Sequence, residues 1–176
     1  MFPPDNETNG KKRGREEVLM KKVLGILAFI VICELAGFIG SIFTTPSIPG
    51  WYAALAKPPF NPPNWVFAPV WTALYALMGI AAYLVYEKGP RRNEVRKALV
   101  VFAFQLVLNT LWSIVFFGAH MILGAAIIII ILWGLIAVSI RLFSKVSRAA
   151  AYLLVPYILW VSFATVLNIS LYVLNR

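Results

Sequence analysis

A long stretch without Lys, Arg, Asp or Glu, residues 98–140, constrains the fold of this chain more than any other feature. As one helix rising about 1.5 Å per residue, it would be roughly 65 Å long, about twice the hydrocarbon core of a bilayer. The stretch must therefore fold back. The turn is predicted at Gly118, Ala119 and His120, because a glycine and the only ionisable side chain of the stretch lie together there. Two antiparallel spans are expected, at 98–117 and 121–141.

Three further apolar stretches are long enough to cross a membrane, at residues 23–43, 65–86 and 149–174. Hydrophobic residues make up 61% of the chain and charged residues 13%, whereas soluble domains are about half apolar and a quarter charged. The expected fold class is therefore all-α, an integral membrane five-transmembrane-helix bundle over residues 22–176, with the lipid bilayer as its surroundings. Residues 1–21 are expected to form a disordered basic tail.

Basic residues alternate between the loops. Lys and Arg cluster before the first span and in the second and fourth loops, whereas the first loop has only Lys57 and the third has none. The positive-inside rule then places the amino terminus in the cytoplasm and the carboxyl terminus outside. A prokaryotic plasma membrane fits this pattern, with a mitochondrial membrane as the alternative. The net charge of +9 is explained by these loops, so nucleic acid is not an expected partner.

The sequence contains no recognisable catalytic apparatus. It has no glycine-rich phosphate loop and no Ser/His/Asp set, and Cys33 and His120 are the only residues of their types. No catalytic residues, no metal ligands and no cofactor are therefore expected. An enzymatic role is left open, although binding is favoured.

The first loop, residues 44–64, is rich in proline and also carries Trp51, Tyr52, Leu55 and Phe60. Its prolines disfavour a long helix. The aromatic side chains permit two interpretations. They form either a lid over the outer mouth of the bundle or an interfacial aromatic belt.

Polar residues at a spacing of four mark one face of the third span. Gln105, Asn109 and Ser113 share this face, and Trp112 lies beside it. The face should point into the bundle because an unpaired amide in lipid is costly. It serves either as interhelical hydrogen bonding or as a polar anchor for a ligand. Trp112, Trp133 and Trp160 similarly provide either ordinary packing or stacking area for a flat ligand.

Two features of the first span are also open to more than one interpretation. Glu34 is the only acidic residue within a span, so it should face the interior or be protonated. Small residues at 36, 37, 40 and 41 permit close helix approach, either within the bundle or across a homodimer.

Four segments resemble the tryptophan-rich sensory protein family, also called the translocator protein or peripheral benzodiazepine receptor family. They are WYAALAKPPFNPP at 51–63, VWTALYALMG at 70–79, QLVLNTLWS at 105–113 and PYILWVSFAT at 156–165. The resemblance covers about residues 22–175 in order. Phe60 departs from the Trp of many members, and Ile169 stands where animal members have the Tyr of a sterol motif. Sterol binding is therefore not expected.

The resemblance implies a five-helix bundle, often dimeric, with a pocket under the first loop for porphyrins and benzodiazepine-type drugs. The residues implied as ligand-binding are Trp51, Phe67, Trp71, Tyr75, Asn109, Trp112, Ser113, Trp160, Ala164 and Leu167. The leading hypothesis is a membrane receptor or carrier for tetrapyrroles, in which Asn109 or Lys57 meets a carboxylate. The alternatives are light-dependent porphyrin degradation involving Trp51, and proton-coupled transport using Glu34.

Overall fold

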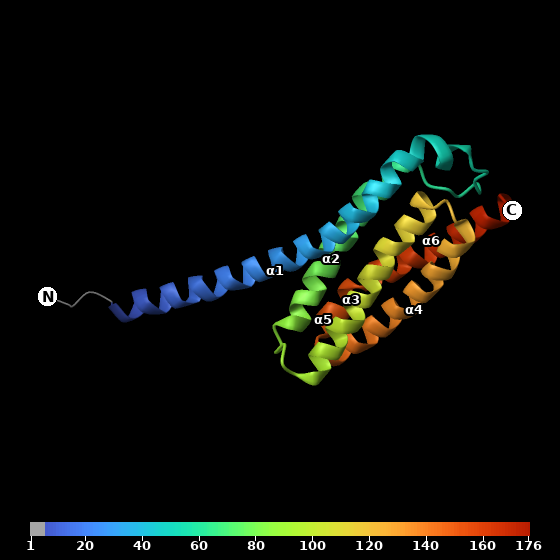
Figure 1. Ribbon diagram of the computed structural model, residues 1–176. Coiled ribbons are helices and arrows are strands. Elements are labelled where there is room, and N and C mark those ends of the chain that lie inside the picture. The colour runs from blue at the N-terminus through green and yellow to red at the C-terminus, as the bar shows by residue number, and fades with distance from the viewer. Residues whose placement is uncertain (1–5) are drawn as a thin grey trace.

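A computed structural model describes residues 6–176, and its regular elements are helices (Figure 1). In chain order they are α1 Asn6–Ser47, η1 Ile48–Tyr52, η2 Asn64–Val66, α2 Phe67–Tyr86, α3 Asn93–Ser113, η3 Ile114–Gly118, α4 Ile122–Val146, α5 Arg148–Leu153 and α6 Val155–Leu174. Five helical segments of the described chain are long and apolar enough to cross a membrane, with α5 and α6 forming the fifth together. The predicted fold class, a five-transmembrane-helix bundle, is confirmed.

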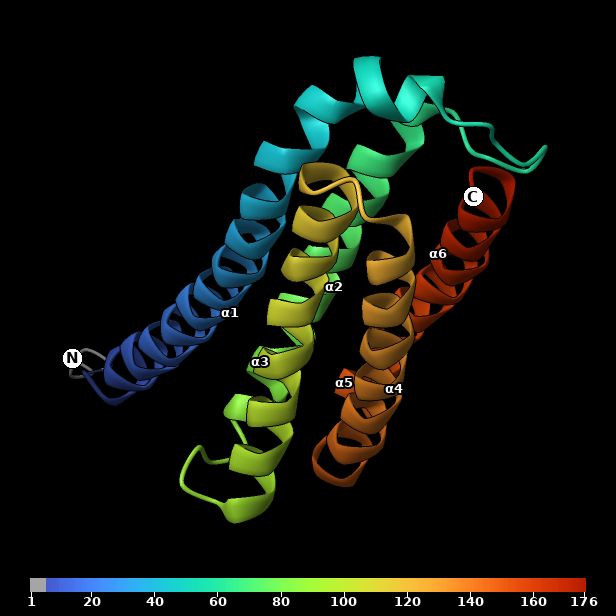
Figure 2. The ribbon, with the colours of Figure 1, turned by 45° about the vertical axis from the view of Figure 1, so that its right-hand side comes forward.

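The helices form a ring in which the order of neighbours differs from the order of the helices along the chain. Helix α1 packs against α2 and α3, α4 packs against α3 and α6, and α5 packs against α2, whereas α2 and α6 barely touch each other. Figure 2 shows the first loop and the α3–α4 turn at one end of the ring and the α2–α3 loop at the other. We call the first the lid end. The other is the basic end, because Lys88, Arg91 and Arg92 lie in its α2–α3 loop.

The turn within the long apolar stretch lies where the sequence indicated. Helical structure ends at Gly118 and resumes at Ile122, and His120 has a positive φ of 57°. The preceding turn, η3, is a π-helix, and Ala119 N–H donates to Ile114 C=O over 2.9 Å. One wide turn followed by a left-handed residue reverses the chain within a few residues.

The fifth span is interrupted near Pro156. Helix α5 ends at Leu153, Leu154 lies between the two helices, and Pro156 occupies the first turn of α6. Proline has no N–H and its ring disfavours the helical conformation of the preceding turn, so the chain starts a new helix there. The interruption separates α5, which packs closely against α2, from α6, which meets α2 mainly through aromatic side chains such as Phe67 and Trp160.

Helix α1 is longer than the sequence indicated at both ends. The sequence predicts a disordered tail over residues 1–21, whereas α1 is helical from Asn6 and projects beyond the bundle (Figure 1). Residues 1–5 lie outside the described part of the chain. At the other end, α1 passes through Pro46 and η1 extends to Tyr52, so the first part of the 44–64 loop is helical. Residues 6–21 contain good helix formers such as Lys, Arg and Glu, and this propensity outweighs their polar composition.

Glycines of the first two spans are used inside the bundle. A Cβ on Gly79 would lie 2.5 Å from the Ile30 Cα, and one on Gly37 would overlap the ring of Tyr75. A Cβ on Gly40 would lie 3.0 Å from the Ser113 Oγ. Of the two interpretations of these small residues, contacts within the bundle therefore account for Gly37 and Gly40. A homodimer stays a prediction.

Candidate functional site: a cavity under the first loop

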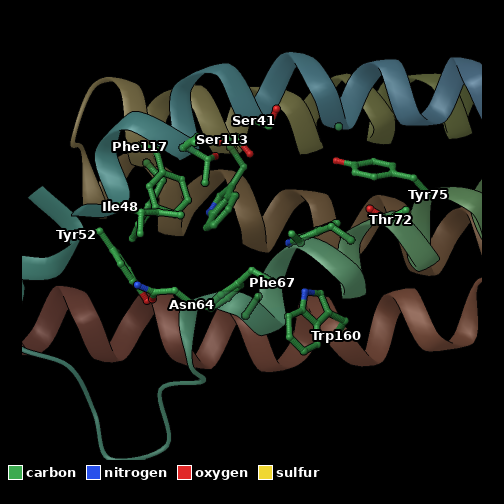
Figure 3. Close-up of a pocket in the computed structure, with 18 of the residues that line it drawn as sticks. Ser41, Ile48, Tyr52, Asn64, Phe67, Thr72, Tyr75, Ser113, Phe117 and Trp160 are labelled. Carbon is green, nitrogen blue, oxygen red and sulfur yellow. The ribbon is translucent and has the colours of Figure 1, made fainter. Parts of the chain in front are cut away.

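A cavity of about 490 Å³ lies within the lid half of the bundle, between α1, α2, α3 and α6. Figure 3 shows it with α1 along one side and α6 along the other, and with Tyr52 and Tyr75 at opposite ends. It exists because α2 and α6 are separated here, and aromatic rings fill part of the space between them. Its volume falls in the range of roughly 300–1,000 Å³ that is typical of small-molecule sites.

Most of the residues that the family resemblance implied as ligand-binding meet in this cavity. Those that line it are Phe67, Trp71, Tyr75, Trp112, Ser113, Trp160, Ala164 and Leu167. They come from three helices, α2, α3 and α6. Because these helices converge only in the folded bundle, residues separated by up to a hundred positions form one wall.

Trp51 and Asn109 do not line the cavity. The indole of Trp51 stacks on His120, with ring centroids 4.3 Å apart and planes inclined by 14°. Its neighbour Tyr52 lines the cavity instead. Asn109 is 2% exposed and lies behind Tyr75, so it does not offer its amide to a ligand in the way that the family resemblance implied.

Asn109 instead belongs to a buried hydrogen-bond chain. The Tyr75 hydroxyl donates to Asn109 Oδ1 over 2.6 Å, Asn109 Nδ2 donates to the Tyr157 hydroxyl over 2.8 Å, and that hydroxyl donates to Gln105 Oε1 over 2.8 Å. The chain joins α2, α3 and α6. Of the polar residues on this face of the third span, Gln105 and Asn109 therefore form hydrogen bonds between helices, whereas Ser113 lines the cavity.

Trp112 is fixed by a second polar contact. Its Nε1 donates to Asn168 Oδ1 over 2.9 Å, and Asn168 Nδ2 donates to Ile122 C=O over 3.0 Å. Asn168 is 1% exposed, so both bonds are shielded from solvent. The indole plane that faces the cavity is thereby held in one orientation, and its own N–H is not available to a ligand.

The first loop is attached to the lid end at several points. Ser47 Oγ donates to Phe117 C=O over 2.7 Å, and the Tyr52 hydroxyl donates to Asn61 Oδ1 over 2.7 Å. Asn175 holds the loop to the end of α6, since its Oδ1 accepts from Ala56 N–H and its Nδ2 donates to Ala56 C=O, each over 2.9 Å. These contacts support the interpretation of the loop as a lid. Trp65, exposed by 75%, suits the interfacial role.

The polar groups of the cavity are unevenly distributed. Its lining includes the carboxylate of Glu34 but no Lys, Arg or His among the described residues. Lys57, expected to meet a ligand carboxylate, instead donates to the carbonyl groups of Ala53 and Leu55. Trp160 Nε1 is buried and has no hydrogen-bond partner within the described chain.

Several lining residues were not identified from the sequence. Apart from Glu34, which the sequence already placed toward the interior, the α1 wall includes Phe38, Ser41 and Thr44, which are spaced by three or four residues as on one helix face. That signal was present but was concealed, because the lipid-facing side of the span is equally apolar. Phe116 and Phe117 also line the cavity, and they follow the matching segment at 105–113 without having been assigned to the site.

The fold and the site together define a class: a polytopic helical membrane protein with a ligand-sized, aromatic-lined cavity inside the bundle. Comparison with known proteins gives the family. The TspO/MBR family profile matches residues 29–174. The tryptophan-rich protein TspO of Chlorobaculum tepidum is 43% identical over 155 residues, which cover 88% of this chain and 98% of the relative. The translocator protein of Bos taurus is 36% identical over 151 residues, 85% of this chain and 89% of the relative.

The chain belongs to the TspO/MBR family. Family membership and the five apolar helices make it an integral membrane protein. Membership also supports a role as a membrane receptor. A relative from Archaeoglobus fulgidus, a tryptophan-rich protein TspO, is 43% identical over 157 residues, which cover 89% of this chain and 98% of the relative. Such prokaryotic relatives fit a prokaryotic membrane.

Proposed function

We propose that this protein is a membrane receptor or carrier that binds tetrapyrroles and similar flat hydrophobic ligands in the cavity under the first loop. The observation that carries the proposal is the aromatic composition of the cavity wall. Trp71 lies on one helix, and its ring centroid is 5.5 Å from that of Tyr75. Trp112 and Trp160 contribute faces from two other helices.

The shape of the cavity supports a flat ligand. Its lining extends from Glu34 on α1 to Ile48 at the start of η1, a length of about 20 Å at a rise of roughly 1.5 Å per residue. Aromatic rings bind planar apolar molecules through large contact areas and offset stacking. A tetrapyrrole fits this description. Its carboxylates would lie toward the lid end, where the loop borders the aqueous phase.

The test removes two indoles that face the cavity. Trp71→Leu combined with Trp160→Leu should weaken protoporphyrin binding at least about tenfold, because both stacking surfaces are lost. Titration in the dark is followed through the absorbance of the porphyrin rather than through tryptophan emission, which the substitutions themselves reduce. The matched control is Trp65→Leu with Trp133→Leu, since neither residue lines the cavity. Equal affinity in the two double variants would disprove the assignment of the pocket.

We also propose an orientation of the protein in the membrane. The basic end lies in the cytoplasm and the lid end lies outside, following the distribution of Lys and Arg. The membrane is the plasma membrane of a prokaryote, and a homodimer is the expected assembly. Labelling of single cysteines introduced at Lys57 and at Arg91 in a Cys33→Ser background, with a membrane-impermeant reagent on whole cells, tests the orientation. Only the cysteine at position 57 should react.

Light-dependent porphyrin degradation is not favoured by a specific observation. The residue first considered for it, Trp51, stacks on His120 and does not line the cavity. Protein-dependent loss of the porphyrin spectrum under illumination, absent in the dark titration, would restore this alternative.

A further inference from the structure

The wall that α1 contributes to the cavity carries hydrogen-bond acceptors beside the apolar residues Gly37 and Phe38. Ser41 Oγ donates its proton to Phe38 C=O over 2.7 Å, and Thr44 Oγ1 donates to Gly40 C=O over 3.1 Å. Both residues line the cavity. Because their protons are directed into the helix backbone, these hydroxyl oxygens present lone pairs to a ligand.

Glu34 is the strongest acceptor of this wall. It lines the cavity near Tyr75, at the end away from the lid. The ion pairs of the described residues use Glu87 and Glu94, so Glu34 has no cationic partner there. Tyr75 does not satisfy it, because that hydroxyl donates to Asn109. A carboxylate in a membrane-spanning segment is costly unless it is paired or neutralised.

Nothing else in the cavity supplies a positive charge. Its described lining contains no basic side chain, and the Trp112 indole N–H, a natural donor, is already bonded to Asn168. Trp160 Nε1 lies on α6, on the opposite side of the cavity from α1 (Figure 3), and has no hydrogen-bond partner within the described chain. Glu34 is therefore the one charged side chain of the described lining, and it lies on the α1 side of the cavity.

We infer that the α1 wall selects ligands whose deep edge carries a protonated nitrogen, with Glu34 as the residue that determines this specificity. The inference rests on the proposed function only in assuming that flat apolar molecules enter the cavity. A protonated amine gives Glu34 a charge-assisted hydrogen bond, which is stronger than one between neutral groups. A carboxylate in the same place meets a like charge and acceptor oxygens, so it is rejected. Ligands with carboxylates bind with those groups turned toward the lid.

Three pyrene probes with the same flat body test the inference: 1-pyrenemethylamine, 1-pyrenemethanol and 1-pyrenecarboxylate. Binding to the full-length protein in a non-ionic detergent is measured at pH 7 by energy transfer from tryptophan to pyrene. The readout is the ratio of amine to alcohol affinity within each protein variant. Differences in how the probes partition into micelles cancel when this ratio is compared between variants, because partition depends on the probe and the detergent and not on the variant.

In the unaltered protein the amine should bind about tenfold more tightly than the alcohol, and the carboxylate should bind most weakly. Glu34→Gln should lower the amine-to-alcohol ratio about tenfold relative to the unaltered protein. Glu34→Asp, which keeps the charge, should retain the preference. The matched control, Glu94→Gln, removes an exposed carboxylate that pairs with Arg92 at the basic end and should retain the full preference.

The outcomes separate this inference from the function on which it rests. An amine preference that persists in Glu34→Gln, or that is absent from the unaltered protein while all three probes bind saturably, overturns the inference alone. If no probe binds saturably and protoporphyrin also fails to bind, the cavity is not a ligand site and both proposals fail. Equal loss of binding for the amine and the alcohol in Glu34→Gln likewise overturns the inference, because it indicates a structural role.

Discussion

The two halves of the bundle differ in how closely neighbouring helices pack against each other. In the basic half, small residues bring backbones together: Gly79 lies against the Ile30 backbone, and Ala81 and Ala98 are fully buried. In the lid half, α2 and α6 separate, and Trp71 and Trp160 occupy part of the space between them. Both halves are predominantly apolar and each contains some polar side chains, so hydrophobicity does not distinguish them.

The difference lies in residue size and in how the polar groups are satisfied. In lipid, helices associate through close packing and hydrogen bonds rather than through the hydrophobic effect. Small residues permit close packing, and the buried chain from Tyr75 to Gln105 provides hydrogen bonds between helices. Large aromatic rings instead hold helices apart and leave a cavity, where Glu34 and Trp160 keep unused bonding capacity. The first half stabilises the bundle, and the second half is available for binding.

The largest expected effect comes from a single methyl group in the packed half. In Gly79→Ala the new Cβ meets the Ile30 backbone, which cannot move aside, so the folded state should lose about 1–3 kcal/mol. Thermal unfolding in detergent, followed by tryptophan emission, measures this loss. The control is Gly134→Ala on α4, where nothing lies within 4 Å of the new Cβ. That change should leave stability equal or raise it by up to about 1 kcal/mol.

A smaller loss is expected when the buried hydrogen-bond chain is cut. Tyr157→Phe keeps the ring but leaves Asn109 Nδ2 without its acceptor and Gln105 Oε1 without its donor, at a cost of about 1–2 kcal/mol. Because Tyr157 does not line the cavity, porphyrin affinity should change less than twofold. Tyr152→Phe, at a residue exposed by 72%, should alter neither. A large change in affinity with no change in unfolding temperature would contradict the division between the halves.

In the lid half, the orientation of one indole should control affinity. Asn168→Leu removes the acceptor of the Trp112 N–H, so the ring is no longer fixed and porphyrin affinity should fall about fivefold, the equivalent of one neutral hydrogen bond. Ser162→Ala is the matched control, since Ser162 accepts from the Trp133 indole outside the cavity. Equal effects of the two substitutions on affinity would show that the Trp112 contact has no special role.

The smallest expected effect is kinetic and concerns the lid. Asn175→Ala removes the two hydrogen bonds to Ala56. These bonds are exposed, so each contributes little to stability, and the unfolding temperature should hardly change. Release of porphyrin should accelerate about threefold, as measured by stopped-flow dilution. Arg176→Ala serves as the control, and an unchanged release rate in Asn175→Ala would mean that the first loop does not limit exit.

The general architecture could be predicted because it follows from local constraints. The thickness of the bilayer fixes the length of a span, so residues 98–140 must fold back. Gly118 and His120, two residues apart, indicate where the turn lies. Helix bounds were less accurate, since helices continue past the apolar core. Thus α1 passes through Pro46 at one end, and at the other end it includes the charged residues that precede the apolar stretch, beginning at Asn6.

The membership of the site depended on tertiary structure. Trp51 and Tyr52 are adjacent aromatic residues, yet Trp51 stacks on His120 and Tyr52 reaches the cavity, because the π-helical turn η1 sets their directions. Asn109 and Ser113 share one helix face, yet partners on α2 and α6 enclose Asn109 and leave Ser113 open. The sequence by itself determined how many times the chain crosses the membrane and which residue types the interior contains. Only the packing of distant helices decided which side chains bond to each other and which face a ligand, since each choice depends on neighbours far away in the chain.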